Sequence, residues 1–286
     1  MKYFDFHCDA LYRCVTENIH FGSHSLTVNK NDVSIFSKYY QCFAVWTPPE
    51  TDDKSKYVND SLNLFNKQVK PLSSETFSPI LTIEDAAFLA DDFSLFERLI
   101  NEKVFSVSLT WNYENAFAGG ALSNARLKPD GVELIKILNN NRIVLDLSHL
   151  NRKSFFDAID RADRVVASHT YIDDLYKHDR NLTLEQMKLL KERNGLIGLC
   201  FYPEFMGTTD VFEGIYKAIS FCAENQLADH IAFGSDFDGA DTPVSLRSIS
   251  LLYEYLLQKG LDEFLLDSVF FDNAYNYYKP LTNTES

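Results

Sequence analysis

The amino-acid sequence predicts an α/β protein folded as a single (β/α)8 barrel, of the TIM type. Its 286 residues match the usual length of one such barrel. Short strand-like runs alternate with amphipathic helical stretches along the whole chain, which is typical of a parallel sheet built from βα units. Eight such units can be counted, and no repeat or linker divides them. We therefore expect one domain over residues 1–286.

The eight strand candidates are short runs rich in β-branched, aromatic and other apolar residues. They are residues 3–9, 40–47, 78–84, 105–111, 142–149, 164–169, 196–202 and 230–236. Helical spacing of apolar residues follows at residues 93–104, 131–140, 154–162, 182–195 and 210–227. Thr183 predicts a capping box at the start of one helix, and Gly195 predicts its C-terminal stop.

Two long segments, residues 21–37 and 116–130, are predicted to be loops. The second contains Gly119 and Gly120, and long loops in such barrels commonly shape the active site. The residues after Thr282 are expected to fray.

Composition limits the classes of function. With 45% hydrophobic residues, the chain can build a large core, whereas a net charge of −14 disfavours nucleic acid and membrane surfaces as partners. No apolar run approaches the roughly 20 residues that span a bilayer, and the first residues resemble a strand rather than a signal peptide. The five cysteines form no CxxC pair and fit a reducing compartment. A cytoplasmic location follows as the expectation.

Polar residues close several of the predicted strands. Because side chains two apart on a strand share a face, Asp5, His7 and Asp9 should point one way, which makes His7 and Asp9 one cluster. The same rule pairs Glu84 with Thr82, Asp236 with Gly234 and Asp238, His149 with Leu147, and His169 with Ala167. Asp146 falls on the face opposite His149, so we expect it to anchor backbone or orient a neighbour.

Five strands would thus deliver a His, Asp or Glu to the C-terminal mouth of the barrel, where enzymes of this fold have their active sites. A lone histidine at a strand end is usually an ordinary hydrogen-bonded residue, and His20, His24 and His230 are interpreted in that way. A whole cluster of carboxylates and imidazoles is costly to bury unless cations compensate it. The mixture of imidazole and carboxylate favours zinc or a similar first-row metal over calcium or magnesium.

Seven motifs then resemble those of the membrane (renal) dipeptidase family, which are zinc peptidases of the amidohydrolase type. They are HCD at 7–9, TIED at 82–85, SLTWNYENAFAGG at 108–120, DLSH at 146–149, SHTY at 168–171, HDRNLT at 178–183 and GSDFDG at 234–239. Each motif is weak by itself, but their order, the HxRNL element and the GSDFDG element are specific.

The resemblance implies two divalent metal ions, with zinc as the expected element. It places His7 and Asp9 on one ion and His149 and His169 on the other, with Glu84 bridging the two. A water activated between the ions would attack the scissile carbonyl.

The resemblance also assigns roles to three further residues. Asp236 would accept the proton of the attacking water and pass it to the leaving amine. Arg180, the arginine of HxRNL, would bind the substrate's terminal carboxylate, for which a guanidinium fork is well suited. Tyr202 is a candidate for lining the pocket.

Trp111 departs from the family's pattern, because well-studied members carry at this position a histidine that contacts the carbonyl under attack. Indole can donate one hydrogen bond but cannot accept a proton. Either Trp111 narrows the pocket for other substrates, or turnover is slower, or the activity is not dipeptide hydrolysis.

The leading interpretation is a zinc-dependent dipeptidase acting on small dipeptides with a free C-terminal carboxylate. One alternative keeps the barrel and the metals but cleaves another amide, a lactone or, less in keeping with an acidic chain, a phosphoester. The other is a catalytically degenerate barrel that binds metal or serves as a scaffold. A homodimer is expected from the resemblance alone, while side-chain preference, stereochemistry and the physiological metal stay open.

Overall fold

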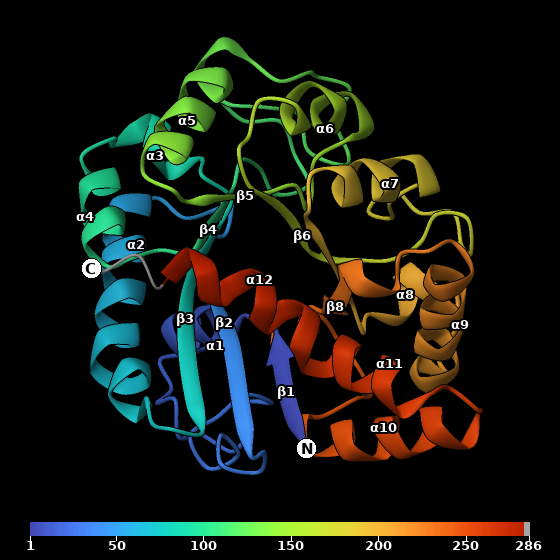
Figure 1. The fold of residues 1–286 in the computed structure, drawn as a ribbon. Coiled ribbons are helices and arrows are strands. Elements are labelled where there is room, and N and C mark those ends of the chain that lie inside the picture. The colour runs from blue at the N-terminus through green and yellow to red at the C-terminus, as the bar shows by residue number, and fades with distance from the viewer. Residues whose placement is uncertain (283–286) are drawn as a thin grey trace.

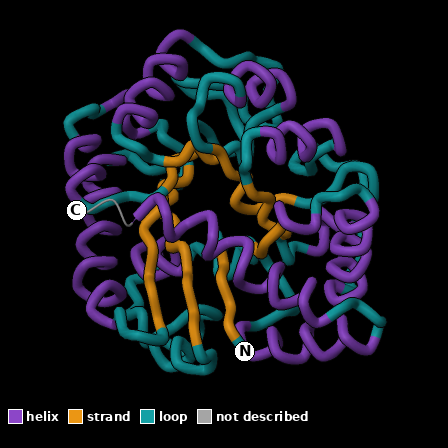
Figure 2. The backbone as a smooth tube through the Cα atoms, in the orientation of Figure 1, coloured by secondary structure: helices purple, strands orange, loops and turns teal. Residues whose placement is uncertain are grey.

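The computed structural model describes residues 1–282 and contains eight parallel strands that close into a barrel (Figures 1 and 2). Each strand pairs with the next along the chain, and the first pairs with the last. The strands are β1 Lys2–Asp5, β2 Lys38–Trp46, β3 Phe77–Glu84, β4 Ser106–Ser108, β5 Val144–Asp146, β6 Val165–Thr170, β7 Leu196–Leu199 and β8 Ile231–Phe233. The predicted (β/α)8 fold is confirmed.

Helices surround the strands, as the ring of purple tubes around the orange ones shows (Figure 2). They are α1 Ala10–Thr16, α2 Lys54–Leu64, α3 Phe88–Asp91, α4 Leu95–Asn101, α5 Pro129–Asn140, α6 Arg152–Ile159, α7 Leu184–Glu192, α8 Pro203–Met206, α9 Val211–Glu224, α10 Ile249–Gln258, α11 Glu263–Asp267 and α12 Asn273–Thr282. Single π-helical turns extend α2 through Phe65–Val69 and join α11 to α12 through Ser268–Asp272.

The barrel interior is apolar at the amino ends of the strands and is closed there by the C-terminal helix. One residue from or beside each strand meets its neighbours in this layer: Phe4, Cys42, Ile80, Phe105, Val144, Val166, Leu196 and Ala232. Phe6, Phe271 and Ala274 complete the cluster, and Figure 1 shows α12 crossing in front of the barrel. The opposite end, where the strands finish, is left for the functional site.

Several strands end earlier than the sequence predicts. Predicted segments at 3–9, 142–149 and 230–236 end as strands at Asp5, Asp146 and Phe233. The polar residues assigned to these strand ends therefore lie on the segments that follow the strands, while β3 runs regularly to Glu84. The hydrogen-bonded pairing of β1, β5 and β8 with their neighbours thus ends before these polar residues are reached.

The helix boundary signals are confirmed at one end of α7 and corrected at the other. Thr183 and Gln186 form the predicted capping box. At the other end the left-handed residue is Asn194, with φ 52°, rather than Gly195. A Cβ on Gly195 would lie 2.7 Å from the carbonyl oxygen of Val165, so the glycine serves close packing on β6.

The two predicted loops have different relations to the mouth. Residues 116–128 precede α5 without regular structure, and Leu122 from this loop lines the main cavity. The loop over residues 21–37 lines no part of that cavity, and it is held instead by Asp238, which accepts the backbone N–H groups of Thr27 and Val28 at 2.8 and 3.0 Å.

Three further expectations concern membrane-spanning helices, the cysteines and the C-terminal residues. Among residues 1–282 no helix combines the length and the apolar character needed to cross a bilayer. All five cysteines are buried and free of disulfides. The predicted fraying after Thr282 lies outside the described residues.

Candidate active site

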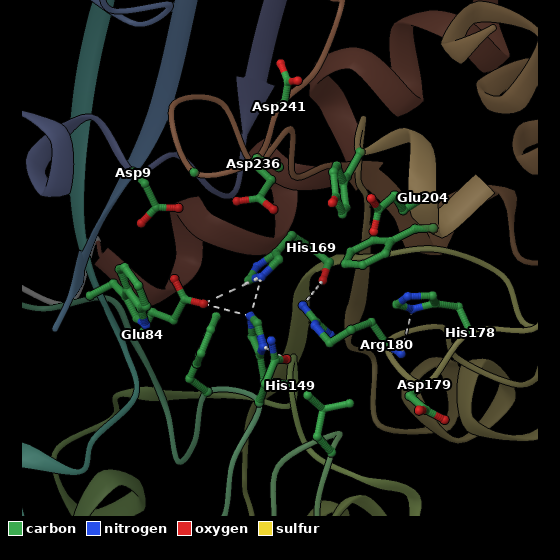
Figure 3. A pocket seen from close by; sticks show the side chains of 18 of the residues that line it. Asp9, Glu84, His149, His169, His178, Asp179, Arg180, Glu204, Asp236 and Asp241 are labelled. Carbon is green, nitrogen blue, oxygen red and sulfur yellow. Dashed lines mark hydrogen bonds and ion pairs between the residues drawn. The ribbon is translucent and has the colours of Figure 1, made fainter. Parts of the chain in front are cut away.

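The main cavity, of about 430 Å³, lies at the mouth of the barrel (Figure 3). It is lined by Asp9, Tyr12, Trp46, Glu84, Trp111, Asn112, Leu122, His149, His169, His178, Asp179, Arg180, Tyr202, Glu204, Phe205, Asp236, Gly239, Ala240 and Asp241. His7 lies against this lining, within 3.2 Å of Glu84. The structure thus brings all nine predicted site residues to one place.

Glu84 stands at the centre of the polar cluster and contacts residues on both sides. Its Oε2 lies 3.2 Å from Nε2 of His7, and its Oε1 lies 2.7 Å from Nε2 of His149. The Oε1 atom is also 3.8 Å from Nε2 of His169. A single buried carboxylate therefore lies between His7 on one side and His149 and His169 on the other, while the rings of His7 and His169 also lie close together, with centres 3.9 Å apart. Figure 3 shows the side of Glu84 that faces His149 and His169.

The first group comes from the segments after β1 and β8. His7 Nε2 lies 3.1 Å from Asp9 Oδ2 and 3.8 Å from Asp236 Oδ1. Gly239 packs beneath both carboxylates, since a Cβ there would lie 2.1 Å from Asp9 Oδ2 and 2.6 Å from Asp236 Oδ1. The second glycine of GSDFDG is thus required by the close approach of two acids.

The second group consists of His149 and His169, whose Nε2 atoms face each other at 2.8 Å. The opposite ring atom of each is engaged: His149 Nδ1 lies 2.8 Å from Asn112 Oδ1, and His169 Nδ1 lies 2.8 Å from Ser168 Oγ. Donation from each Nδ1 to these oxygens leaves a lone pair on each Nε2. In that tautomer each Nε2 is free to act as a metal ligand.

Strict strand alternation, used to place these histidines, is wrong for β1, β5 and β6. Leu147 and Ala167, the residues that should share faces with His149 and His169, pack in the outer layer against the helices. His149 reaches the mouth because it adopts the left-handed region, with φ 67°, and His169 because the β6–β7 register shifts between Ala167 and Thr170.

Just after β1, alternation continues as far as Phe6, whose side chain lies in the barrel interior, and is lost beyond it. Asp5 therefore does not join the cluster but accepts the backbone N–H groups of Ser235 and His7 at 2.8 and 3.3 Å. Asp238 is also absent from the cavity lining, contrary to its predicted face with Asp236.

Asp146 has the anchoring role predicted for it. Its Oδ1 accepts the backbone N–H groups of Ser148 at 3.0 Å and Ser168 at 2.9 Å. Ser148 Oγ in turn accepts the N–H of His169 at 3.1 Å. This network ties the end of β5 to β6, and so fixes the spacing of the two cavity histidines.

Burial and neighbouring charges shift the pKa values of the three cavity histidines in opposite directions. Burial, reinforced by Arg180, lowers the pKa of His149 to about 4, and burial lowers that of His169 well below its usual range. Burial also opposes charge on His7, but Asp9 and Glu84 outweigh it and raise the pKa of His7 well above its usual value. The carboxylates of Asp9 and Glu84 thus favour positive charge at this position.

The residues fit divalent metal ions by their donor set and their unsatisfied atoms. His7, Glu84 and His169 form one group whose ligand atoms lie within 4.8 Å of one another, and His7, Asp9 and Asp236 form another. Asp9 Oδ1 is buried and has no hydrogen-bond partner among the described residues. Neutral imidazole and carboxylate together suit zinc or a similar first-row ion.

Arg180 lies in the same cavity with its cation buried. Its Nη2 donates to the carbonyl oxygen of His169 at 3.1 Å, and its guanidinium lies 5.3 Å from the centre of the Phe205 ring (Figure 3). Its Nε is buried and finds no hydrogen-bond partner in the part of the chain described. Burial lowers the pKa of Arg180, so an anionic ligand would stabilise it here.

Aromatic rings form the wall on the other side of the cavity. Trp111 packs on Trp46 with ring centres 5.2 Å apart, and Trp46 packs on Tyr12 at 4.9 Å. Trp111 is also 6.2 Å from the ring of His149. Tyr202 lines the side nearer Arg180, packed on Phe205 at 5.1 Å.

Asn112, Trp46 and Gly239 are among the lining residues that sequence reasoning missed. Asn112 follows Trp111 within the quoted SLTWNYENAFAGG motif, and Gly239 ends GSDFDG, so both were visible as motif positions without a role. Trp46 closes a predicted strand, and the alternation rule could have placed it at the mouth.

Two comparisons of the sequence identify relatives. The membrane dipeptidase family (peptidase family M19) matches residues 57–280, which leaves His7 and Asp9 outside the matched segment. An uncharacterised Klebsiella pneumoniae protein from the pqqA 5′ region is 30% identical over 59% of this chain and 69% of its own length. Dipeptidase tcpJ of Claviceps purpurea is 28% identical over 54% of this chain, but that match spans only 39% of the Claviceps protein.

Solved structures share the fold over nearly the whole chain. A metallopeptidase from Rhodobacter sphaeroides, solved with a phosphinate mimic of the dipeptide L-Ala-D-Ala, has a TM-score of 0.81 at 23% identity and covers 98% of this chain and 99% of its own. The probable dipeptidase PvdM from Pseudomonas aeruginosa has a TM-score of 0.83 at 15% identity, covering 98% and 95%.

Proposed function

Because this chain belongs to the membrane dipeptidase family, peptidase family M19, we propose that it is a metallo-dipeptidase that hydrolyses small dipeptides with a free C-terminal carboxylate. The observation that carries the proposal is the pairing of two features in one cavity. A cluster of metal-ligand type surrounds Glu84, and Arg180 lies beside it with a buried N–H that has no partner among the described residues.

Two zinc ions are the proposed cofactors. His7 and Asp9 would hold one ion, His149 and His169 the other, and Glu84 would be shared between them, as its contacts on both sides support. Bound there, divalent ions supply Lewis acidity that lowers the pKa of a water molecule and polarises a carbonyl group. Asn112 and Ser168 would keep the two imidazoles in the ligand tautomer.

Asp236 is the proposed general base and acid. Its carboxylate lies 3.8 Å from Nε2 of His7 and borders the cavity, so it can reach a water held beside the cluster. It would accept the proton of that water as the oxygen attacks the carbonyl carbon, and then donate the proton to the leaving amine. The carbon–nitrogen bond breaks with that second transfer.

The charge of the cavity favours a dipeptide over a phosphoester as the substrate. Arg180 is the one Lys or Arg in the lining of the described cavity, beside the carboxylates of Asp9, Glu84, Asp179, Glu204, Asp236 and Asp241. A dipeptide brings one carboxylate for Arg180 and an ammonium group that suits acidic surroundings. A phosphoester, with more negative charge, would meet repulsion from most of this lining.

The test of this proposal is hydrolysis of a dipeptide and of its C-terminal amide by the zinc-loaded protein. The wild type should strongly prefer the free acid. Arg180→Ala should lower kcat/KM for the acid about ten- to a hundredfold, since a charged hydrogen bond contributes roughly 1.5–3 kcal/mol. The mutant should discriminate far less between acid and amide.

Arg152→Ala is the matched control, because Arg152 is an exposed arginine paired with Asp173 at 3.0 Å outside the cavity. It should retain the wild-type preference. An Arg180→Ala enzyme with an unchanged acid-to-amide ratio would mean that the carboxylate is bound elsewhere. Substrates should include L-Ala-D-Ala, whose mimic was bound by the Rhodobacter sphaeroides peptidase.

A cytoplasmic location and a homodimer complete the proposal. The five buried thiols without disulfides support a reducing compartment. The homodimer is supported by family resemblance alone.

A further inference from the structure

A second cavity of about 130 Å³ lies beside the main one, and a single described residue, Trp111, lines both. The smaller cavity is bounded by Thr47, Pro49, Lys54, Asp85, Ala87, Phe88, Trp111, Tyr113, Glu114 and Asn115. The indole lies 6.2 Å from the ring of His149 in the main cavity and 5.5 Å from the ring of Tyr113 in the second. Trp111 is therefore the partition between them.

The partition is held firmly in place. The indole packs on Trp46, and its backbone is clamped by Gly120, where a Cβ would lie 2.1 Å from the carbonyl oxygen of Trp111. The N–H of Gly120 donates to Tyr113 at 3.2 Å, and the N–H of Leu122 donates to Asn112 at 2.8 Å. These contacts fix the backbone from which the indole projects, and the packing on Trp46 supports the ring, so a bulky substrate group would meet a wall here.

The second cavity has the character of a side-chain subsite. The hydroxyl of Thr47, a residue only 7% exposed, has no hydrogen-bond partner among the described residues. Asp85 accepts from Asn115 Nδ2 at 2.8 Å, from the N–H of Ala87 at 3.0 Å and from the backbone N–H of Trp111, which ties the backbone of Trp111 to the wall of this cavity. Phe88 and Tyr113 contribute aromatic rings to the lining, and Lys54 and Glu114 contribute charges of opposite sign. Such a cavity would accept an uncharged side chain with a polar end.

The order of strands around the barrel indicates which end of a dipeptide faces this partition. Trp46 ends β2 and Trp111 follows β4, whereas Arg180 lies between β6 and β7. In a closed ring of eight strands these two groups lie across the mouth from each other. If Arg180 binds the C-terminal carboxylate, the amino-terminal residue of the dipeptide points toward Trp46 and Trp111.

We propose that Trp111 is a specificity-determining residue that limits the amino-terminal residue of the substrate to a small side chain. Its removal would join the second cavity to the site as a subsite for a longer, polar-ended side chain. This inference rests on the proposed dipeptidase function, and it assigns the departure from the family's histidine a role in substrate selection.

The test compares the zinc-loaded wild type with Trp111→Ala and Trp111→Phe on Ala-Ala, Leu-Ala and Gln-Ala. The wild type should favour Ala-Ala. Trp111→Ala should shift the kcat/KM ratio toward Gln-Ala and Leu-Ala by at least about tenfold, the scale on which pocket size discriminates between side chains. Trp111→Phe retains an aromatic wall and should stay near the wild-type ratio.

The matched control is Phe264→Ala, which removes a largely exposed ring that lines neither cavity. Phe264→Ala should show the wild-type ratio between the three substrates. In a second control, Trp111→Ala should treat Ala-Leu and Ala-Gln, which vary the C-terminal residue, as the wild type does. A Trp111→Ala ratio equal to that of the wild type, or a shift confined to the C-terminal residue, would overturn the assignment. Trp111→Leu carries the same test if the alanine variant does not fold.

A binding measurement separates this inference from the dipeptidase proposal. Trp46 and Trp111 are the two tryptophans of the chain, so Trp46 is the single tryptophan in Trp111→Ala and can be excited selectively at about 295 nm or above, where tyrosine no longer absorbs. Its emission should report tighter binding of a phosphinate analogue of Gln-Ala than of Ala-Ala. Equal binding of the two analogues overturns the role of Trp111, whereas binding without any dipeptide hydrolysis by the wild type overturns the dipeptidase function.

Discussion

Glu84→Gln should abolish binding of the two proposed metal ions and, with it, the hydrolytic activity. The substitution keeps the shape of the side chain but removes the negative charge that faces His7 at 3.2 Å and His149 at 2.7 Å. Breaking a buried charge pair costs about 3–5 kcal/mol, so metal affinity should fall by at least about a hundredfold. Metal content after dialysis and kcat/KM on a dipeptide measure the effect.

Glu133→Gln provides the matched control, because Glu133 is an exposed glutamate of α5 paired with Lys136 at 2.6 Å. It should bind metal and turn over like the wild type. The shared role of Glu84 would be contradicted if its glutamine variant kept two ions per chain. Loss of one ion alone would place Glu84 on a single metal.

Asp236→Asn should keep most of the metal but lower kcat by at least about two orders of magnitude, the usual scale for general acid–base catalysis. Its Oδ1 lies 3.8 Å from His7 Nε2, farther than the 3.1 and 3.2 Å contacts of Asp9 and Glu84. Asparagine preserves the side-chain shape above Gly239 but cannot accept and return a proton.

The measurement is kcat together with zinc content, with Asp60→Asn, an exposed aspartate paired with Lys56, as the control. Unchanged turnover in Asp236→Asn would remove this residue from the chemistry. A parallel loss of zinc and rate would make it chiefly a metal ligand, which its grouping with His7 and Asp9 also allows.

The fold could be predicted because hydrophobic periodicity is repeated around the barrel. Eight apolar runs followed by helical stretches leave few arrangements other than a closed parallel sheet. Glu84 could be placed in detail, since β3 keeps regular alternation to its last residue. Thr183 could be predicted as a cap because its capping box depends on local sequence alone.

The mouth of the barrel could be predicted in composition but not in geometry. His149 enters the cavity through a left-handed backbone conformation, and His169 through a shift in register. Neither departure leaves a signal in an alternation pattern, because non-glycine residues adopt φ > 0 only when surrounding contacts favour it. The alternation argument thus selected two histidines that line the cavity, while giving the wrong faces for their neighbours.

Contacts across the chain explain the remaining gaps. Asn112 meets His149 from 37 positions away, and Gly239 meets Asp9 from the opposite end of the sequence. The second cavity behind Trp111 is built from three separate segments, so no local pattern could indicate it. Such features depend on the closure of the barrel.

The most direct test of a two-metal centre divided by Glu84 is the number of divalent ions bound per chain. Elemental analysis should be done after zinc reconstitution and removal of loosely bound metal. We expect about two ions per chain, as a dinuclear hydrolytic site requires. A stoichiometry that stays well below one, with the same thermal stability before and after chelation, would contradict the account.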